Sequence, residues 1–294
     1  MAYGSPTETG GNDGVEAYFT HIRGGRKPSA EAVDELRERY RAIRGSPLTE
    51  ITRAQARALA ARLGLPVFAG MKHAPPFIAD AAAEARSTGI ERLVGLPLAP
   101  HYAEMSLGAY FASLRQAWDG DLIVVRGFHD HPAFIAAARN LLAEALADFE
   151  PDRMFFTAHS LPARIEQAGD RYRERLLETC RMVAEGIPLP QWEFAFQSAS
   201  HTGEPWLGPD LLESLARSGA GKVLVCPIGF VADHLEILYD VDVEAMAFAR
   251  EHGIDLRRTK SFNTRPEFID ALAAVVGDAL VKALPARSAG RMTE

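Results

Sequence analysis

The chain has 294 residues, of which 47% are hydrophobic and 24% charged, and its net charge at pH 7 is −7. This balance is typical of a folded globular protein, and the length suffices for one large domain or two of ordinary size. A negative chain without Lys/Arg clusters interleaved with aromatic residues does not resemble a nucleic-acid-binding protein. Two cysteines, Cys180 and Cys226, exclude a disulfide framework and any site that needs four thiolates.

Neither a membrane-spanning segment nor a targeting signal is visible in the sequence. No apolar run approaches the ~20 residues that a transmembrane helix needs. Residues 1–6 (MAYGSP) have no basic start and no long apolar stretch, unlike a signal peptide. We therefore expect a cytoplasmic protein without a transmembrane segment.

Short apolar segments alternate with longer amphipathic ones along the chain. The predicted strands are 67–70, 92–98, 121–126, 153–158, 192–197 and 222–228. The predicted helices are 29–43, 52–63, 75–87, 107–118, 132–148, 169–185, 209–218 and 266–284. This alternation favours an α/β fold with parallel sheets covered by helices. The units form two sets, divided near 128–134 without a Gly/Ser-rich linker, which indicates two abutting domains that share a cleft.

Polar residues follow several of the predicted strands directly. In open α/β sheets, ligands bind beyond the carboxyl ends of the strands. We therefore expect functional residues in four stretches, at 97–105, 158–162, 197–209 and 227–244.

A histidine, His159, ends the apolar strand predicted at 153–158. Histidine titrates near neutral pH, and its neutral imidazole is a good ligand for borderline metals. A structural histidine at a strand end is the alternative, and position alone does not separate the two.

Acidic residues recur every four positions at Glu236, Asp240 and Glu244, so in a helix they would share one face. Such like-charge pairs cost about 0.2–0.5 kcal/mol each in an isolated helix. The neighbouring Leu235, Ile237, Leu238 and Val241 predict a mostly buried helix, where a carboxylate row is costly unless a cation lies on it. A hydrated metal ion moving along the row would meet that need. The alternative is a solvated acidic face, although lysines at neutralising offsets are missing.

These segments together resemble the ferrochelatases, and most closely the bacterial coproporphyrin III ferrochelatases. The matching stretches are 1–6 (MAYGSP), 18–28 (YFTHIRGGRKP), 46–48 (SPL), 72–73 (KH), 98–101 (LAPH), 158–162 (AHSLP), 205–209 (PWLGP) and 227–240 (PIGFVADHLEILYD). The resemblance covers almost the whole chain, and the combination of AHSLP with PIGFVADHLEILYD is highly specific.

The resemblance implies two similar Rossmann-like domains, each a four-stranded parallel sheet with helices, and a porphyrin in the cleft between them. The first domain would comprise 1–128 and the returning C-terminal segment 262–294. The second, 129–261, would carry the metal site.

The resemblance also implies roles for individual residues. His159 matches the metal-site histidine, Glu236 its acidic partner, and Asp240 and Glu244 an outer relay for metal or protons. Tyr3 matches the tyrosine that approaches iron from the opposite face. The positions that match substrate-holding residues are Arg23, Arg39, Tyr40, Ser46 and Tyr110. Positions near the cleft whose roles are less defined are Gln55, Lys72, His73 and Trp206.

The implied activity is insertion of Fe²⁺ into coproporphyrin III, giving iron coproporphyrin for haem biosynthesis. Two pyrrole protons must leave and the ring must distort, which a binding cleft can promote. A group that titrates near neutrality suits proton acceptance, and whether His159 accepts the proton, binds iron or does both stays open. Four propionates would require more polar partners than the two of protoporphyrin.

Two departures from the family pattern lead to further expectations. Some relatives bind a [2Fe–2S] cluster through four cysteines, so with two we expect no cluster and no permanently bound cofactor, Fe²⁺ being a substrate. Relatives also carry a short apolar strand before the MAYG motif, and we expect translation to begin upstream of Met1. The subgroup suggests a monomer.

Three other functions compete with this hypothesis. The chain could act on protoporphyrin IX, or it could be a cobaltochelatase for sirohydrochlorin, although the PWLGP and VADHLEILYD stretches favour iron. A tetrapyrrole carrier without insertion activity is the non-enzymatic alternative. A carrier needs neither His159 nor Glu236, which counts against it.

Overall fold

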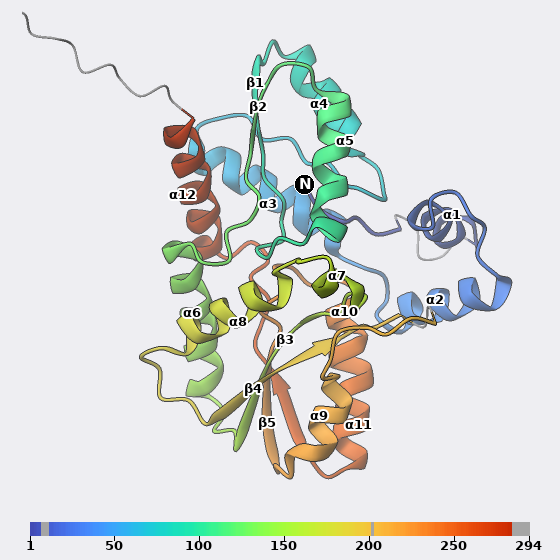
Figure 1. Cartoon of the computed structure of the whole chain (residues 1–294), viewed down its shortest axis with the longest axis vertical. Coiled ribbons are helices and arrows are strands. Elements are labelled where there is room, and N and C mark those ends of the chain that lie inside the picture. The colour runs from blue at the N-terminus through green and yellow to red at the C-terminus, as the bar shows by residue number, and fades with distance from the viewer. Residues whose placement is uncertain (7–11, 201–202, 284–294) are drawn as a thin grey trace, which may run out of the picture.

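The computed structural model describes residues 1–6, 12–200 and 203–283 and has an α/β architecture with two parallel sheets (Figure 1). One sheet lies with α3, α4 and α5 at one end of the molecule, and the other lies with α9 and α11 at the opposite end (Figure 1). Helices α1 and α2 project to one side, whereas α6 and α12 pack together on the other. No described helix combines the length and apolarity needed to cross a bilayer.

The first part of the chain carries a two-stranded parallel sheet, in which Arg92 pairs with Asp121 and Gly95 with Val124. Its elements are α1 (Asn12–Ile22), α2 (Ala30–Ala42), α3 (Leu48–Leu63), α4 (Ile78–Ser87), β1 (Arg92–Gly95), the π-helical turn η1 (Glu104–Gly108), α5 (Ala109–Ala117) and β2 (Asp121–Val124).

The remaining part carries a four-stranded parallel sheet of order β4-β3-β5-β6. Its elements are α6 (Pro132–Ala147), β3 (Arg153–His159), α7 (Arg164–Gln167), α8 (Tyr172–Ala184), β4 (Gln191–Gln197), α9 (Leu211–Ser218), β5 (Lys222–Cys226), α10 (Leu235–Leu238), the π-helical turn η2 (Asp240–Ala245), α11 (Met246–Glu251), β6 (Asp255–Arg258) and α12 (Pro266–Lys282).

Two four-stranded sheets were predicted, and one of them is observed. The sheet of the first part has two strands among the described residues. The strand predicted at 67–70 does not form. That segment leads into isolated bridges of Met71 with Ala2 and Phe77, without a ladder on either side. Conversely, the prediction missed β6, an edge strand that reads Asp-Leu-Arg-Arg and has no apolar run to reveal it.

Strand β3 is central to the larger sheet and is buried on both faces, which explains its unbroken apolar sequence. Phe155 packs on the side of α9 and α11, whereas Phe156 belongs to a second cluster. That second cluster also contains Leu59 of α3 and Leu272 of α12, so both parts of the chain share one core. The burial of β3 fixes the position of His159 at its carboxyl end.

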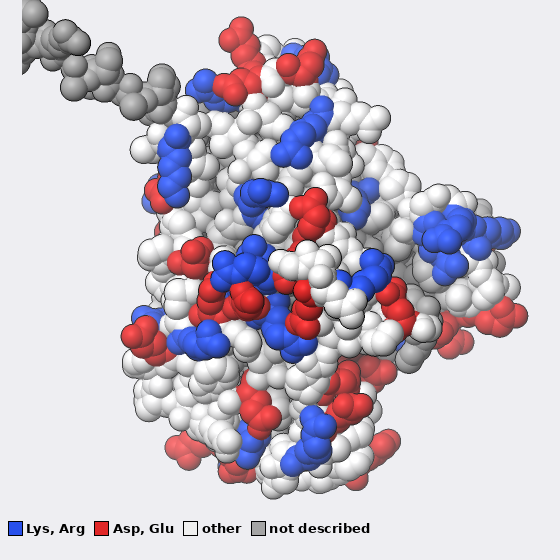
Figure 2. All heavy atoms as spheres, viewed as in Figure 1, with Lys and Arg blue, Asp and Glu red and all other residues white. Residues whose placement is uncertain are grey.

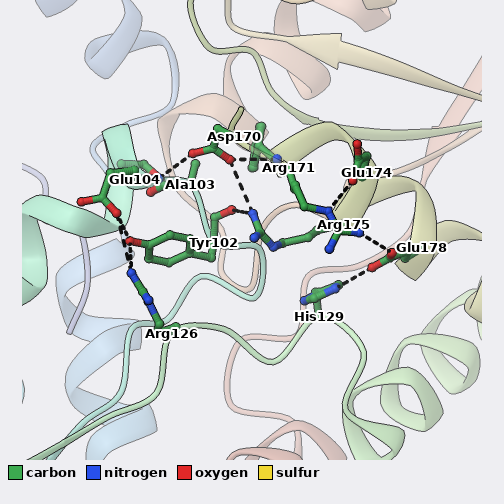
Figure 3. A network of polar contacts seen from close by, with 12 residues as sticks. Tyr102, Ala103, Glu104, Arg126, His129, Asp170, Arg171, Glu174, Arg175 and Glu178 are labelled. Carbon is green, nitrogen blue, oxygen red and sulfur yellow. Dashed lines mark hydrogen bonds and ion pairs between the residues drawn. The ribbon is translucent and has the colours of Figure 1, made fainter. Parts of the chain in front are cut away.

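Polar contacts also join the two parts of the chain (Figure 3). The Glu104 N–H donates to Asp170 Oδ2 at 2.7 Å, and Arg175 Nη1 donates to the Tyr102 carbonyl at 2.9 Å. Beside them, His129 Nε2 lies 3.0 Å from Glu178 Oε2 within the second part of the chain. The first two contacts hold the start of α8 against the residues that lead into η1.

The close approach of Gly229 to β3 gives a first prediction. Its N–H donates to the Thr157 carbonyl at 3.0 Å, and a methyl group there would lie 2.4 Å from the Ala158 Cβ. We expect Gly229→Ala to lower the free energy of unfolding by about 1–3 kcal/mol through overpacking, measured by urea denaturation. The control Gly221→Ala meets its nearest atom, Asp152 Oδ2, at 3.5 Å and should change stability by less than about 0.5 kcal/mol. Equal effects of the two variants would contradict this packing argument.

Candidate active site

His159 lies at the carboxyl end of β3, partly exposed, with its backbone held in place. The Tyr172 hydroxyl donates to the His159 carbonyl at 3.0 Å, and the Trp206 ring centre lies 6.3 Å from the imidazole centre. The imidazole Nδ1 contacts the Ser160 carbonyl, which can only accept a hydrogen bond. Nδ1 therefore carries the proton, and the lone pair of Nε2 is available to a metal ion or a proton.

Glu236 in α10 is tied to the same sheet by the buried side chain of Gln197. Gln197 Nε2 donates to the Glu236 carbonyl at 2.6 Å, and Gln197 Oε1 accepts from Thr157 Oγ1 at 2.7 Å. Gln197 is also the strand partner of His159 in the β3–β4 register. His159 and Glu236, far apart in sequence, are thus both neighbours of one residue.

His234 faces the carboxylate of Glu236. Its Nδ1 donates to the Ala232 carbonyl at 2.8 Å, and its Nε2 lies 3.2 Å from Glu236 Oε2. Because Nδ1 already carries a proton, Nε2 and the carboxylate oxygen can share this contact only with a second proton between them. The pair is therefore arranged to hold one exchangeable proton.

The acidic segment is not the continuous α-helix that its spacing predicts. The short helix α10 ends at Leu238, and η2 follows with π-helical winding, in which the Glu244 N–H donates to the Tyr239 carbonyl at 2.9 Å. Asp240 is buried and Glu236 partly buried, as expected, but Glu244 is exposed. π-Helical turns inside helices occur frequently at functional sites.

Asp240 has a pKa raised to about 7, chiefly because burial disfavours its charged form. The negative charges of Glu236 and Glu244 raise the pKa of Asp240 further, so both carboxylates act on Asp240 despite the irregular helix. A hydrogen bond from Ser198 and the charge of Arg39, whose Nη1 lies 4.0 Å from Asp240 Oδ1, oppose the shift.

Four tyrosines lie close enough to Glu236 for its charge to act on their pKa. Burial raises the pKa of Tyr18, Tyr40 and Tyr110, and the negative charge of Glu236 adds to each shift. The pKa of Tyr3 is raised by desolvation of its hydroxyl and then by Glu236, although 39% of the residue is exposed. The structure thus brings three predicted residues, Tyr3, Tyr40 and Tyr110, to one place, and it adds Tyr18.

Lys72 and His73 border the same tyrosines. Lys72 Nζ lies 5.4 Å from the Tyr110 ring centre, and burial lowers its pKa. The His73 ring lies 4.6 Å from that of Tyr3, and its pKa is lowered to about 4 by burial and by the charges of Lys72 and His21. His73 is therefore neutral at physiological pH.

Three other predicted residues, Arg23, Ser46 and Gln55, make contacts outside the group around Glu236. Arg23 is exposed after α1, with its guanidinium 5.8 Å from the Phe19 ring centre. The Ser46 hydroxyl accepts from the Leu48 N–H at 3.4 Å, and buried Gln55 donates to the Asn263 carbonyl at 2.7 Å.

Sequence reasoning did not identify Gln197, Ser198 or His234 as members of this site. All three fall in the polar stretches that follow strands, at 197–209 and 227–244, so the position after a strand was the available signal. Within the described ranges, no three His, Cys, Asp or Glu side chains converge closely enough to hold a metal ion by themselves.

Asp240 leads to a prediction about stability and pH. Its pKa of about 7 exceeds the 3.8 of a free aspartate, so between these values the folded state binds more protons than the unfolded state. Stability therefore falls as pH rises through this window, by an amount on the order of 4 kcal/mol for the full shift. We expect Asp240→Asn to match the wild type near pH 4 and to be more stable than it at pH 8, in urea unfolding. A difference that does not grow with pH would refute the assignment.

Comparison with known proteins gives a consistent result. The family model described as Ferrochelatase matches residues 1–280. A ferrochelatase from Herpetosiphon aurantiacus is 41% identical over 296 residues, which cover 94% of this chain and 96% of the relative. Coproporphyrin III ferrochelatases from Halalkalibacterium halodurans and Bacillus subtilis are 39% and 38% identical, each over 94% of this chain and over 94% and 95% of the relatives.

Solved structures share the fold at much lower identity. SirB from Bacillus subtilis, solved with Fe³⁺, has a TM-score of 0.59 at 12% identity and covers 78% of this chain and 88% of its own. CbiX, described as the terminal enzyme of sirohaem biosynthesis in denitrifying bacteria, has a TM-score of 0.56 at 16% identity, with 82% and 95% covered. These likenesses establish a chelatase-like α/β fold.

Proposed function

Because this chain belongs to the ferrochelatase family, whose reaction inserts ferrous iron into a porphyrin, we propose that its own porphyrin is coproporphyrin III. The product would be iron coproporphyrin, an intermediate of haem biosynthesis. The observation that carries the proposal is the placement of Glu236, which shares the neighbour Gln197 with His159 and whose charge acts on Tyr3 and Tyr40. Relatives named for coproporphyrin III support the choice of substrate.

We assign the metal side of the reaction to His159 and Glu236. Among described residues, the basic side chains paired with the carboxylate row are His234, whose Nε2 lies 3.2 Å from Glu236 Oε2, and Arg39, whose Nη1 lies 4.0 Å from Asp240 Oδ1. Three carboxyl groups thus face two basic groups, which suits the row to an incoming Fe²⁺. Asp240 and Glu244 form the outer part of the carboxylate row. Asp240 has a pKa of about 7, which suits it to pass on protons released by the pyrrole nitrogens.

The porphyrin side is assigned to the tyrosines and to nearby basic groups. A flat macrocycle can lie against the exposed ring of Tyr3, which would face the metal from the side opposite His159, and the buried Tyr40 and Tyr110 would support that face of the site. Arg23, Arg39 and Ser46 would pair with propionates. Lys and Arg side chains gather over the projecting α1 region (Figure 2), where Arg23, Arg26 and Lys27 are exposed. Roles for Gln55, Lys72, His73 and Trp206 stay less defined.

The finer organisation is also a proposal. We divide the chain into 1–128 with 262–294 and into 129–261, with the cleft between them. The packing of α12 on α3, β1 and β2 supports its place with the first part, and α12 also packs on α6 of the second part. The single pair of cysteines, both buried, supports the absence of an iron–sulfur cluster. A cytoplasmic monomer stays a prediction.

The substrate is tested by mixing the protein anaerobically with Fe²⁺ and either coproporphyrin III or protoporphyrin IX and following metallation by absorbance. We expect a higher kcat/KM for coproporphyrin, because the basic groups above offer partners for four propionates. Faster turnover of protoporphyrin would contradict the choice of substrate. Turnover only of sirohydrochlorin with Co²⁺ would contradict the function as a whole.

The role of His159 is tested by His159→Ala. A positioned acid or base contributes about 10²–10⁴-fold, so we expect kcat to fall by at least about 10²-fold. Porphyrin affinity, measured by fluorescence quenching, should change little because other residues hold the ring. The matched control is His252→Ala, at an exposed helix end, which should keep wild-type activity. Near-normal turnover in the His159 variant would mean that the role is misassigned.

A further inference from the structure

An arginine, Arg258, contacts the acidic segment and has no role in the reaction proposed above. Arg258 ends β6 and is largely buried, with 14% of its side chain exposed. Its Nε donates to Asp242 Oδ1 at 2.6 Å and its Nη2 donates to Asp242 Oδ2 at 2.8 Å, so the interaction is bidentate. The same Nη2 lies 3.3 Å from Asp233 Oδ1. One guanidinium therefore holds two further carboxylates of the acidic segment, Asp233 before the row and Asp242 between Asp240 and Glu244.

Asp233 makes three further hydrogen bonds, which involve Ser261 and Asn263. The Ser261 hydroxyl donates to Asp233 Oδ1 at 2.7 Å, and Asn263 Nδ2 donates to Asp233 Oδ2 at 2.7 Å. The Asp233 N–H donates in turn to Asn263 Oδ1 at 2.9 Å. These contacts fix the residue from which the chain enters α10 and reaches Glu236.

Asn263 connects this network to the first part of the chain. Its φ of 46° lies in the left-handed region, and its N–H donates to the Val231 carbonyl at 3.0 Å. Its carbonyl accepts from buried Gln55 of α3 at 2.7 Å. Gln55 thereby gains a role in support of the loop before α10.

We propose that Arg258 is a positioning residue that fixes the acidic segment at its start and within η2 and removes Asp233 and Asp242 from competition for the incoming ferrous ion. This inference rests on the proposed insertion reaction. Five carboxyl groups lie between 233 and 244, and Arg258 occupies the two that are not in the row. The row of Glu236, Asp240 and Glu244 is left for iron.

The planar guanidinium of Arg258 can donate two parallel hydrogen bonds, and positioning of the acidic segment depends on this bidentate geometry. Asp242 lies inside η2, so a two-pronged hold on its carboxylate fixes the π-helical turn that separates Asp240 from Glu244. Lysine offers one compact charge and cannot grip both oxygens in a fixed plane. A lysine at 258 would keep the charge and lose the orientation.

The test is steady-state insertion of Fe²⁺ into coproporphyrin III by Arg258→Lys and Arg258→Gln. Loss of a residue that orients metal-binding groups commonly costs about 10–100-fold in metal affinity or activity. We expect the KM for Fe²⁺ to rise by about 10-fold or more in both variants, while the KM for the porphyrin stays within about twofold. A purely structural loss would change both substrates together.

The control is Arg257→Lys, the same substitution at the adjacent exposed position, where the guanidinium lies 3.8 Å from Asp255. It should leave both KM values unchanged. An unchanged KM for Fe²⁺ in a folded Arg258→Lys protein, or an equal rise for both substrates, would overturn the inference. Because these readouts require an active wild type, a wild type that inserts no iron would instead contradict the proposed function.

Discussion

The buried amide of Gln197 is the contact on which the arrangement of the site depends. It accepts from Thr157 in β3 and donates to the backbone of Glu236, while its own strand register sets it beside His159. Leaving either end of a buried amide unpaired would cost about 1–3 kcal/mol, so sheet and acidic segment are held together by a strong constraint. The burial of β3 gives this constraint a rigid base.

The acidic segment shows what the site requires of a ligand. Burial and the charges of its neighbours raise the pKa of Asp240 to about 7, so an uncompensated row is partly protonated near neutral pH. In the proposed reaction, a divalent cation would displace those protons, so that metal uptake and proton release would involve the same carboxyl groups. Burial keeps Tyr40 and Tyr110 protonated beside Glu236.

The sequence predicted the strands of the larger sheet other than β6, and it pointed to His159 and Glu236, because apolar runs and polar residues after strands are local patterns. It did not predict η2, because the four-residue spacing of the acidic side chains indicates a regular α-helix and carries no signal for π-helical winding. It missed β6 because a charged edge strand lacks an apolar run. The sequence did not identify Gln197, because nothing in it distinguishes one glutamine from the other polar residues that follow the strand.

The central claim is that His159 and Glu236 together receive the metal. Its most direct test is an anomalous difference map from crystals soaked anaerobically in Co²⁺, a non-oxidising substitute for Fe²⁺, with data collected at the cobalt edge. The account predicts a peak within coordination distance of His159 Nε2 and the Glu236 carboxylate. A map in which cobalt occupies only other carboxylates, with none beside His159, would contradict it.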